Sequence, residues 1–263
     1  MNEQHLFTLF CKNLSMYVSG GSDCQVEFSD RDLWQRLTKV LRLRVGEKLL
    51  LFDEHINAAA VVLEKTFAKK ELLALHIESV NPNQALKPNI TLMPCLLKKD
   101  AFEDVVYAAA QMGVNKIIPV LSDKVQRSWG EKKERERLFN IMVAACEQSK
   151  NFFLPEICEP VKIQDVDLEL SEGRISQARK FGGVQNLKIY FDPSGACFVD
   201  LLQKIKTATD LHISLFFGPE GGLTSLEEKQ LSDLGFETYA LTPTILRARE
   251  AVIVGLGGVR SAR

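Results

Sequence analysis

Residues 212–228 read HISLFFGPEGGLTSLEE, and this stretch decides the fold class. An apolar run typical of a buried strand passes directly into the loop 218–222, GPEGG, and a segment with helical character follows. Thr224 and Glu227 have the spacing of a capping box, which fixes where that helix begins. The stretch therefore predicts a strand, a tight loop and a helix in succession.

The glycines of this loop suit close approach of the backbone to a ligand, because glycine has no side chain and tolerates positive φ. In open α/β sheets ligands lie beyond the carboxyl ends of the strands, which is where the loop falls. The loop lacks the GxxxxGK[ST] pattern of phosphate-binding loops and the full GxGxxG dinucleotide pattern. Spacing alone leaves two alternatives open, a binding loop and a plain tight turn.

The surrounding sequence alternates between the two periodicities of strand and helix. Residues 90–96 and 114–120 predict strands on either side of a helix over 101–112 that Gly113 ends, a unit that implies a parallel sheet. Further strands are expected over 187–192, 212–217 and 236–241, and further helices over 132–149, 198–207, 225–234 and 245–256. Residues 171–186 are polar and predict a loop.

The first eighty residues follow a different pattern. Short apolar or alternating runs over 45–53, 58–67 and 72–80 predict a small β-barrel. One helix is expected near 33–43, capped by Asp30, with an apolar face formed by Leu33, Leu37, Val40 and Leu41. Residues 81–89, NPNQALKPN, predict a linker. We therefore expect domains at 1–80 and 90–263.

The composition of the 263 residues is that of an ordinary globular protein, with 46% hydrophobic and 25% charged residues and a net charge of −1. No apolar run approaches the length of a membrane span and the first residues do not resemble a signal peptide, so a cytoplasmic location without membrane contact is expected. The six cysteines form no CxxC pair and the four histidines are scattered, so no metal site is expected.

Local charge is more informative than net charge. The segment 31–48 is rich in cations, and Arg36, Lys39 and Arg42 would lie largely off the apolar helix face and be free to meet phosphate. We expect five of them to contact an RNA backbone: Arg36, Lys39, Arg42, Arg44 and Lys48. A second cluster over 124–137 alternates with three glutamates, and a solvated helix face explains it equally well.

A second candidate binding stretch is ALTPTILRAREAVIVGL, residues 240–256. It bends after a strand at Thr242-Pro243-Thr244 and then presents Arg247, Arg249 and Glu250 near the start of a helix. A guanidinium beside a glycine-rich cleft suits an electron-rich base or a phosphate. Arg247 lies nearer the loop than Arg249 and is the better candidate.

At these residues the sequence resembles a known family. FFGPEGGLTSLE with LTPTILR resembles the RsmE family of 16S ribosomal RNA uracil-N3 methyltransferases, in the SPOUT superfamily. The resemblance extends over nearly the whole chain. Its other parts are KVLRLRVGEKLLLFD (39–53), AAQMGVNKIIPVLSDK (109–124), AACEQSKNFFLPEI (144–157) and DPSG (192–195).

The resemblance implies a PUA-like, RNA-binding β-barrel over 1–80 and an α/β SPOUT methyltransferase domain with a deep trefoil knot over 90–263. It also implies a homodimer, S-adenosylmethionine as methyl donor, and 16S ribosomal RNA of the small ribosomal subunit as substrate. The cofactor contacts that it implies are Asp192, Pro193, Phe217, Gly218, Pro219, Glu220, Gly221, Gly222, Leu241, Thr242, Pro243, Ile245, Leu246 and Arg247.

Catalytic roles are expected for three of the charged residues. Arg247 would stabilise the negative charge that develops on uracil when N3 loses its proton. Glu220 or Glu250 would accept that proton, although bonding to loop amides is an alternative role for Glu220. The target base must be unpaired or flipped out of a helix to expose N3.

The chain departs from the family pattern at three positions. Arg249 stands where the family has a glutamate, Gln111 where a glutamate is common, and Asn151 where an arginine is common. These departures leave two other functions open. One is an RNA-binding or ribosome-assembly protein that has lost catalysis, and the other is a SPOUT methyltransferase acting on a different RNA.

Overall fold

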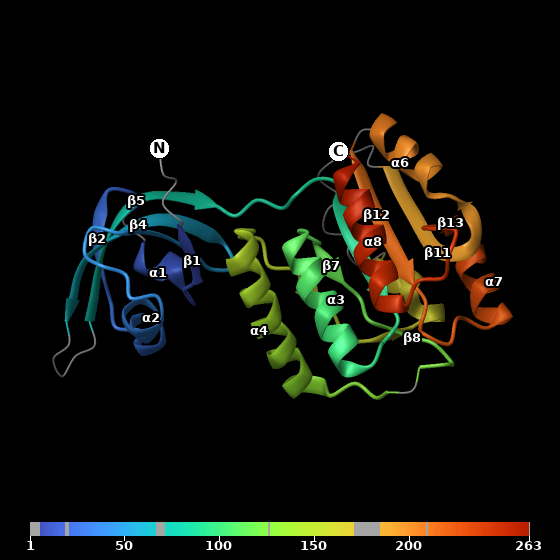
Figure 1. Ribbon diagram of the computed structural model, residues 1–263, viewed down its shortest axis with the longest axis horizontal. Coiled ribbons are helices and arrows are strands. Elements are labelled where there is room, and N and C mark those ends of the chain that lie inside the picture. Colours follow the sequence, from blue (N-terminus) through green and yellow to red (C-terminus); the bar gives the residue numbers. More distant parts are fainter. Residues whose placement is uncertain are drawn as a thin grey trace. The chain divides into compact units, whose positions relative to one another are not determined.

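The computed structural model describes residues 6–18, 21–66, 72–125, 127–170, 185–208 and 210–262 (Figure 1). The chain forms two compact units: Met1–Gln84 with Cys146–Phe153, and Ala85–Ala145 with Leu154–Arg263. The boundary falls inside the stretch 81–89. Residues 146–153, which include the end of helix α4 (Glu131–Ser149), belong to the first unit. No pattern in the sequence predicts this.

The first unit is built on a five-stranded sheet in the order β1-β3-β4-β5-β2. β1 pairs with β3 in parallel, and the other neighbours are antiparallel. The strands are β1 (Phe7–Phe10), β2 (Cys24–Phe28), β3 (Lys48–Phe52), β4 (Ile56–Thr66) and β5 (Leu72–Pro82). The expected runs 45–53, 58–67 and 72–80 correspond to β3, β4 and β5, whereas β1 and β2 were missed.

The helix expected near 33–43 is shorter and irregular. Asp30 does cap it, since its side chain accepts a hydrogen bond from Leu33 N at 3.0 Å. Helix α2 (Arg31–Gln35), however, runs into a π-helical segment η1 (Arg36–Val40). The wider π turn shifts the positions that face the core, so the expectation that Val40 lies on the apolar face is wrong: it is 71% exposed.

Asp53 ties the remaining short helix of the first unit, α1 (Leu14–Tyr17), to the end of β3. Its buried carboxylate accepts hydrogen bonds from the backbone N–H groups of Ser15, His55 and Ile56, each at 2.8 Å. These bonds outweigh the desolvation that would raise the pKa of Asp53, and the pKa is lowered.

The second unit is built on a six-stranded sheet in the order β13-β11-β12-β6-β7-β9, and all its pairs are parallel. The strands are β6 (Asn89–Pro94), β7 (Lys116–Ile117), β9 (Glu156–Ile157), β11 (Gln185–Cys197), β12 (Leu211–Phe217) and β13 (Glu237–Ala240). The parallel sheet expected from the alternating pattern is confirmed. β12 lies inside it, buried on both faces, as its apolar run predicts.

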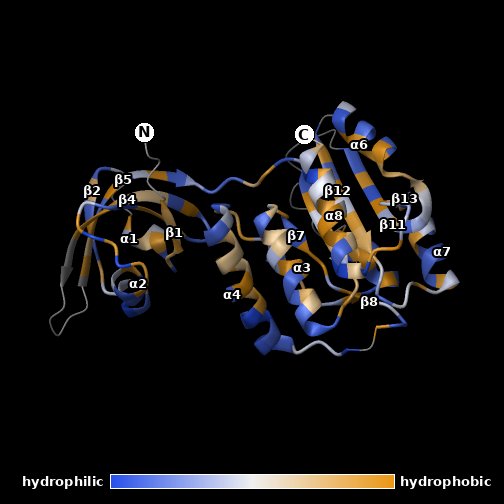
Figure 2. Cartoon of the chain, viewed as in Figure 1, coloured by the Kyte–Doolittle hydropathy of each residue, from blue (hydrophilic) through white to orange (hydrophobic). Residues whose placement is uncertain are grey.

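The described helices of the second unit include α3 (Lys99–Gln111), α6 (Phe198–Thr207), α7 (Ser225–Asp233), α8 (Ala248–Ser261) and the part of α4 up to Ala145, with a short 3₁₀ turn η2 (Ile163–Asp165). α3 and α8 pack side by side (Figure 1). Hydrophobic residues gather along β12, whereas the first turns of α4 are hydrophilic (Figure 2). No helix among the described residues is long and apolar enough to span a membrane.

Two expectations for this unit need correction. The strand expected over 114–120 is split: β7 joins the large sheet, whereas β8 (Val120–Leu121) pairs with β10 (Val161–Lys162). The last helix begins at Ala248 rather than 245, which leaves 245–247 as part of the preceding bend. The loop expected over 171–186 lies mostly outside the described residues, and its last two residues open β11.

Arg260 fixes the end of α8 against the end of α3. Its guanidinium donates to the carbonyl oxygens of Met112, Pro88 and Gly113 at 2.8 to 3.0 Å. Burial lowers the pKa of Arg260 to about 10. Two of these acceptors, Met112 and Gly113, lie at the C-terminal end of α3, where partial negative charge favours a cation.

Candidate functional site

A cavity of about 1010 Å³ lies at a bend within β11 and beyond the carboxyl ends of β12 and β13, the strands on either side of it. Its position is the one expected for a ligand site in an open parallel sheet. The lining residues are Lys98, Asp100, Ala101, Asp104, residues 190–193, residues 217–222, Leu241, Thr242 and residues 244–251. All of them belong to the second unit.

The loop after β12 supplies one wall of the cavity. Phe217 is buried and stacks on Phe191, with ring centroids 4.9 Å apart. Gly222 has a φ of +66° and donates to Pro219 O at 2.9 Å, so the loop folds into a tight turn that requires glycine. The predicted capping box of Thr224 is present and begins α7 directly behind the loop.

The bend after the regular part of β11 supplies the second wall. The β11–β13 register shifts between Phe191 and Ala196, and Gly195 lies so close to β13 that an added Cβ would be 2.4 Å from Tyr239 N. Asp192 Oδ1 accepts hydrogen bonds from Ser194 N at 2.9 Å and from Ser194 Oγ at 2.6 Å. This carboxylate therefore shapes the bend as well as lining the cavity.

The segment between β13 and α8 supplies the third wall. Thr242 Oγ1 donates to Thr244 O at 2.6 Å and closes the bend. Of the predicted cofactor contacts, Pro243 is exposed and is absent from the cavity lining, where Thr244 is found instead. Ile245 is 86% exposed at the cavity, and Arg247 precedes the first turn of α8.

A group of charged side chains lies where α3 and α8 begin. Arg249 donates from Nη1 to Asp104 Oδ2 at 2.8 Å and from Nη2 to Glu250 Oε1 at 2.6 Å. The guanidinium of Arg249, with a smaller contribution from Arg247, lowers the pKa of Glu250. Glu220, in contrast, is exposed and has no hydrogen-bond or ion-pair partner among the described residues.

Sequence reasoning missed the part of the cavity that α3 contributes, namely Lys98, Asp100, Ala101 and Asp104. Asp104 and Arg249 are 145 residues apart in sequence, so only the packing of α3 on α8 brings them together. The one available signal was Arg249 itself, because an arginine where the RsmE resemblance implies a glutamate suggests an acidic partner nearby.

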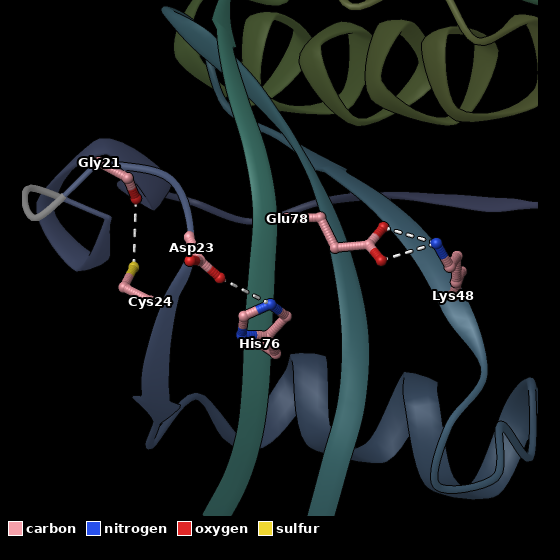
Figure 3. Close-up of polar contacts among 6 residues, drawn as sticks. All are labelled: Gly21, Asp23, Cys24, Lys48, His76 and Glu78. Atoms are coloured by element: carbon pink, nitrogen blue, oxygen red, sulfur yellow. Dashed lines mark hydrogen bonds and ion pairs between the residues drawn. The ribbon is translucent and has the colours of Figure 1, made fainter.

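The basic residues of the first unit divide into two groups. Arg36 donates to both carboxylate oxygens of Glu147, at 2.9 and 2.6 Å, and Glu147 also accepts from Phe10 N. Lys48 on β3 is paired with Glu78 on β5 at 2.7 and 2.9 Å (Figure 3). Arg36, which was expected to be free to meet phosphate, is instead held by Glu147, and Lys48 is held by Glu78. Contact of either residue with RNA stays a prediction.

The other three predicted RNA contacts are exposed. Lys39 lies over the ring of Trp34, 5.6 Å from its centroid, and Arg42 adopts a left-handed backbone with φ of 54°. The side chains of Lys39, Arg42 and Arg44 form no ion pair with a described residue. An RNA-binding role for these three stays a prediction.

The second basic cluster is largely neutralised. Arg127 pairs with Glu134, Arg135 with Glu159 and Arg137 with Glu103, and Lys132 lies 3.9 Å from Glu136. This pattern favours the solvated helix face over a nucleic-acid surface. Within the described parts of the chain, no three histidine, cysteine or acidic side chains are grouped so as to hold a metal ion.

The fold and the site together define an α/β domain whose parallel strands end at a glycine-rich ligand cavity. A model of the RNA methyltransferase domain matches residues 84–259, which include every residue that lines the cavity. The chain belongs to this RNA methyltransferase family.

Similar proteins include ribosomal RNA small subunit methyltransferase E of Rickettsia conorii, 27% identical over 223 residues that cover 84% of this chain and 83% of the relative. The protein of the same name from Bacillus subtilis is 24% identical over 231 residues, 85% of each chain. A crystal structure of the Neisseria gonorrhoeae enzyme bound to S-adenosyl methionine has a TM-score of 0.75 at 23% identity over 98% of both chains. This likeness shows a shared fold.

Proposed function

We propose that the chain is an S-adenosylmethionine-dependent methyltransferase of small-subunit ribosomal RNA, acting on N3 of a uracil in 16S ribosomal RNA. The observation that carries the proposal is the cavity formed by the bend within β11 and the bends after β12 and β13. The relatives' name supports ribosomal RNA as the substrate, and the named ligand of the Neisseria structure supports the donor.

The cavity fits a donor of this kind. Its volume of about 1010 Å³ is at the upper end of the range of small-molecule sites, so it can hold a nucleoside-sized ligand and still leave space for a base. The backbone at Gly222 faces open space and would let a ligand come close, and the bends at 192–193 and 241–247 would hold its other faces. When bound, S-adenosylmethionine supplies a methyl group already activated by a sulfonium.

Arg247 is the residue best placed to assist the acceptor. It lines the cavity, it is exposed there, and no described carboxylate forms an ion pair with it. Loss of the N3 proton spreads negative charge over the uracil oxygens, and a nearby guanidinium would stabilise that charge. Arg247 therefore has the charge and the position for the role expected of it.

Glu220 is favoured over Glu250 as the proton acceptor. The carboxylate of Glu250 is engaged by Arg249, and its lowered pKa makes it a weaker base. The carboxylate of Glu220 lines the cavity without such a partner among the described residues. Glu250 would then contribute by fixing Arg249 at the cavity.

The RNA backbone would contact the first unit through Lys39, Arg42 and Arg44. Cations of this kind position phosphates without reading the base sequence. The five-stranded sheet of this unit would correspond to the PUA-like barrel of the family, and the second unit to the knotted SPOUT domain. The cytoplasm, where ribosomal RNA is modified, is the expected location.

A homodimer is also part of the proposal. Ile253 and Val254 are 39% and 41% exposed on α8, the helix whose start lines the cavity. Apolar side chains on such a face suit an interface between two copies of the chain.

Methyl transfer to isolated 16S RNA and to small subunits tests the proposal directly. The full chain is incubated with labelled S-adenosylmethionine, and the RNA is digested to nucleosides for mass spectrometry. The expected product is 3-methyluridine. Arg247→Ala and Glu220→Gln should lower the rate at least tenfold, whereas the exposed control Lys229→Ala on α7 should leave it unchanged.

Other products would point to the competing functions. A methylated ribose, or product only on another RNA, would indicate a different substrate. Binding of RNA with no methylated product under any condition would indicate a protein that has lost catalysis.

A further inference from the structure

Lys124 holds the loop after β12 from outside the cavity. It follows β8, and its ammonium Nζ donates to Gly221 O and to Leu223 O, each at 3.0 Å. The aliphatic part of the side chain lies against the same loop, since a Cβ added at Gly221 would be 3.4 Å from Lys124 Cδ. Lys124 itself does not line the cavity.

The neighbouring residue holds the far end of the loop. Asp123 N donates to Glu227 Oε1 at 2.8 Å. The other oxygen of Glu227 accepts from Thr224 N at 2.7 Å and from Thr224 Oγ1 at 2.9 Å, and this glutamate is only 4% exposed. Two consecutive residues after β8 thus fix the segment 221–227 at both ends.

The loop needs such support. After Phe217 it leaves the sheet, and Gly221 and Gly222 are exposed. Glycine has more conformational freedom to lose on ordering than any other residue. A loop already held in its binding conformation loses less entropy when a ligand binds, so the affinity is higher.

These contacts also account for a motif that the methyl-transfer site leaves unexplained. The stretch resembling a central family motif ends in LSDK, residues 121–124, and Lys124 is the first cation of the basic cluster 124–137. Its ammonium is occupied by two backbone carbonyls of the loop rather than presented to an RNA phosphate.

We infer that Lys124 is a positioning residue for the cofactor loop, which sets the affinity for S-adenosylmethionine without touching it. The inference rests on the proposed cofactor site. Lys124 differs in this from the catalytic residues. Loss of its ammonium weakens binding of the donor, while RNA affinity and the rate at saturating donor stay close to those of the native chain.

The test compares Lys124→Met, which keeps an unbranched stem but removes the donor, with Lys124→Arg, which keeps N–H donors. Lys229→Met, on the exposed surface of α7, is the matched control. Calorimetry gives the dissociation constant for S-adenosylmethionine. Hydrogen exchange of the ligand-free chain reports the order of the 218–224 amides, and steady-state kinetics give KM for donor and RNA separately.

We expect Lys124→Met to weaken donor binding roughly five- to twentyfold, because two charge-assisted hydrogen bonds are lost. The 218–224 amides should exchange faster, and KM should rise for the donor alone. Lys124→Arg should recover most of the affinity, and Lys229→Met should match the native chain.

Donor affinity within twofold of native in Lys124→Met, with unchanged exchange in the loop, would overturn the inference. So would an equal loss of RNA affinity. If Lys124→Met is poorly folded, Lys124→Leu, which also lacks a donor, gives the same comparison with Lys124→Arg. If the native chain binds no S-adenosylmethionine, the proposed function fails, whereas faster loop exchange in Lys124→Met would still show that Lys124 orders the loop.

Discussion

Arg249 on α8 and Asp104 on α3 form an ion pair at the cavity, with Nη1 and Oδ2 2.8 Å apart. The same guanidinium holds Glu250, so a single cation balances two carboxylates where the two helices begin. The resemblance to the RsmE family implies a glutamate at this position, whereas this chain has an arginine that pairs with an acidic residue on α3. The departure is therefore compatible with an intact site.

Reversing the charge of Arg249 should damage the site through repulsion. Arg249→Glu puts a third carboxylate beside Asp104 and Glu250, and we expect kcat/KM to fall roughly tenfold while the thermal midpoint changes little, because the pair is exposed. The double variant Arg249→Glu/Asp104→Arg should recover a large part of the activity. No recovery, measured as a double-mutant cycle, would show that the pair does not matter to the site.

Acid should destabilise the first unit through Asp53. Its pKa is lower in the folded chain than in the unfolded one, so its contribution is present above its ordinary value near 3.8 and is lost as the pH falls below it. Asp53→Asn should cost about 1–3 kcal/mol at pH 7 and much less at pH 3. Urea denaturation at both pH values checks this, and an equal loss at both would be inconsistent with it.

Gly195 should resist substitution because of its contact with β13. A methyl group there would lie 2.4 Å from Tyr239 N, so Gly195→Ala must push two strands apart, at a cost of about 1–3 kcal/mol. The displaced strand should also move the bend at 192–193, and donor binding should become weaker. Ala196→Ser, at the exposed neighbouring position, is the control. Native stability and donor affinity in Gly195→Ala would contradict this reading.

The cations of the first unit should separate into structural and RNA-binding residues. Arg44→Ala should weaken RNA binding and reduce the salt slope of the affinity by about 1, with stability unchanged. Arg36→Ala breaks the paired hydrogen bonds to Glu147 and should cost about 1–3 kcal/mol of stability. If the salt dependence of RNA affinity fell for Arg36→Ala but not for Arg44→Ala, Arg36 would be the RNA-binding residue and this prediction would be wrong.

Much of the second unit could be predicted because its signals are local. The apolar run of β12, the capping box of Thr224 and the helical spacing of α3 each depend on a few adjacent residues. Local spacing left the loop 218–222 open between a binding loop and a plain turn, and the resemblance to the RsmE family implied that it and 241–247 form one pocket. Both segments line the cavity, except for Pro243.

The remaining features depend on contacts between distant segments. The hydrogen bond from Asp123 to Glu227 joins residues 104 apart, and the pairing of Arg36 with Glu147 joins residues 111 apart. No periodicity encodes such contacts. The π-helical segment after Gln35 was missed for a different reason, since a regular 3.6-residue period was assumed across it.

Titration of the full chain with S-adenosylmethionine, followed by hydrogen exchange with and without the donor, tests the central claim most directly. The account predicts saturable binding of one donor per chain and slower exchange confined to the bends at 192–193, 218–222 and 241–247. No heat of binding, or protection elsewhere with these bends unchanged, would contradict it.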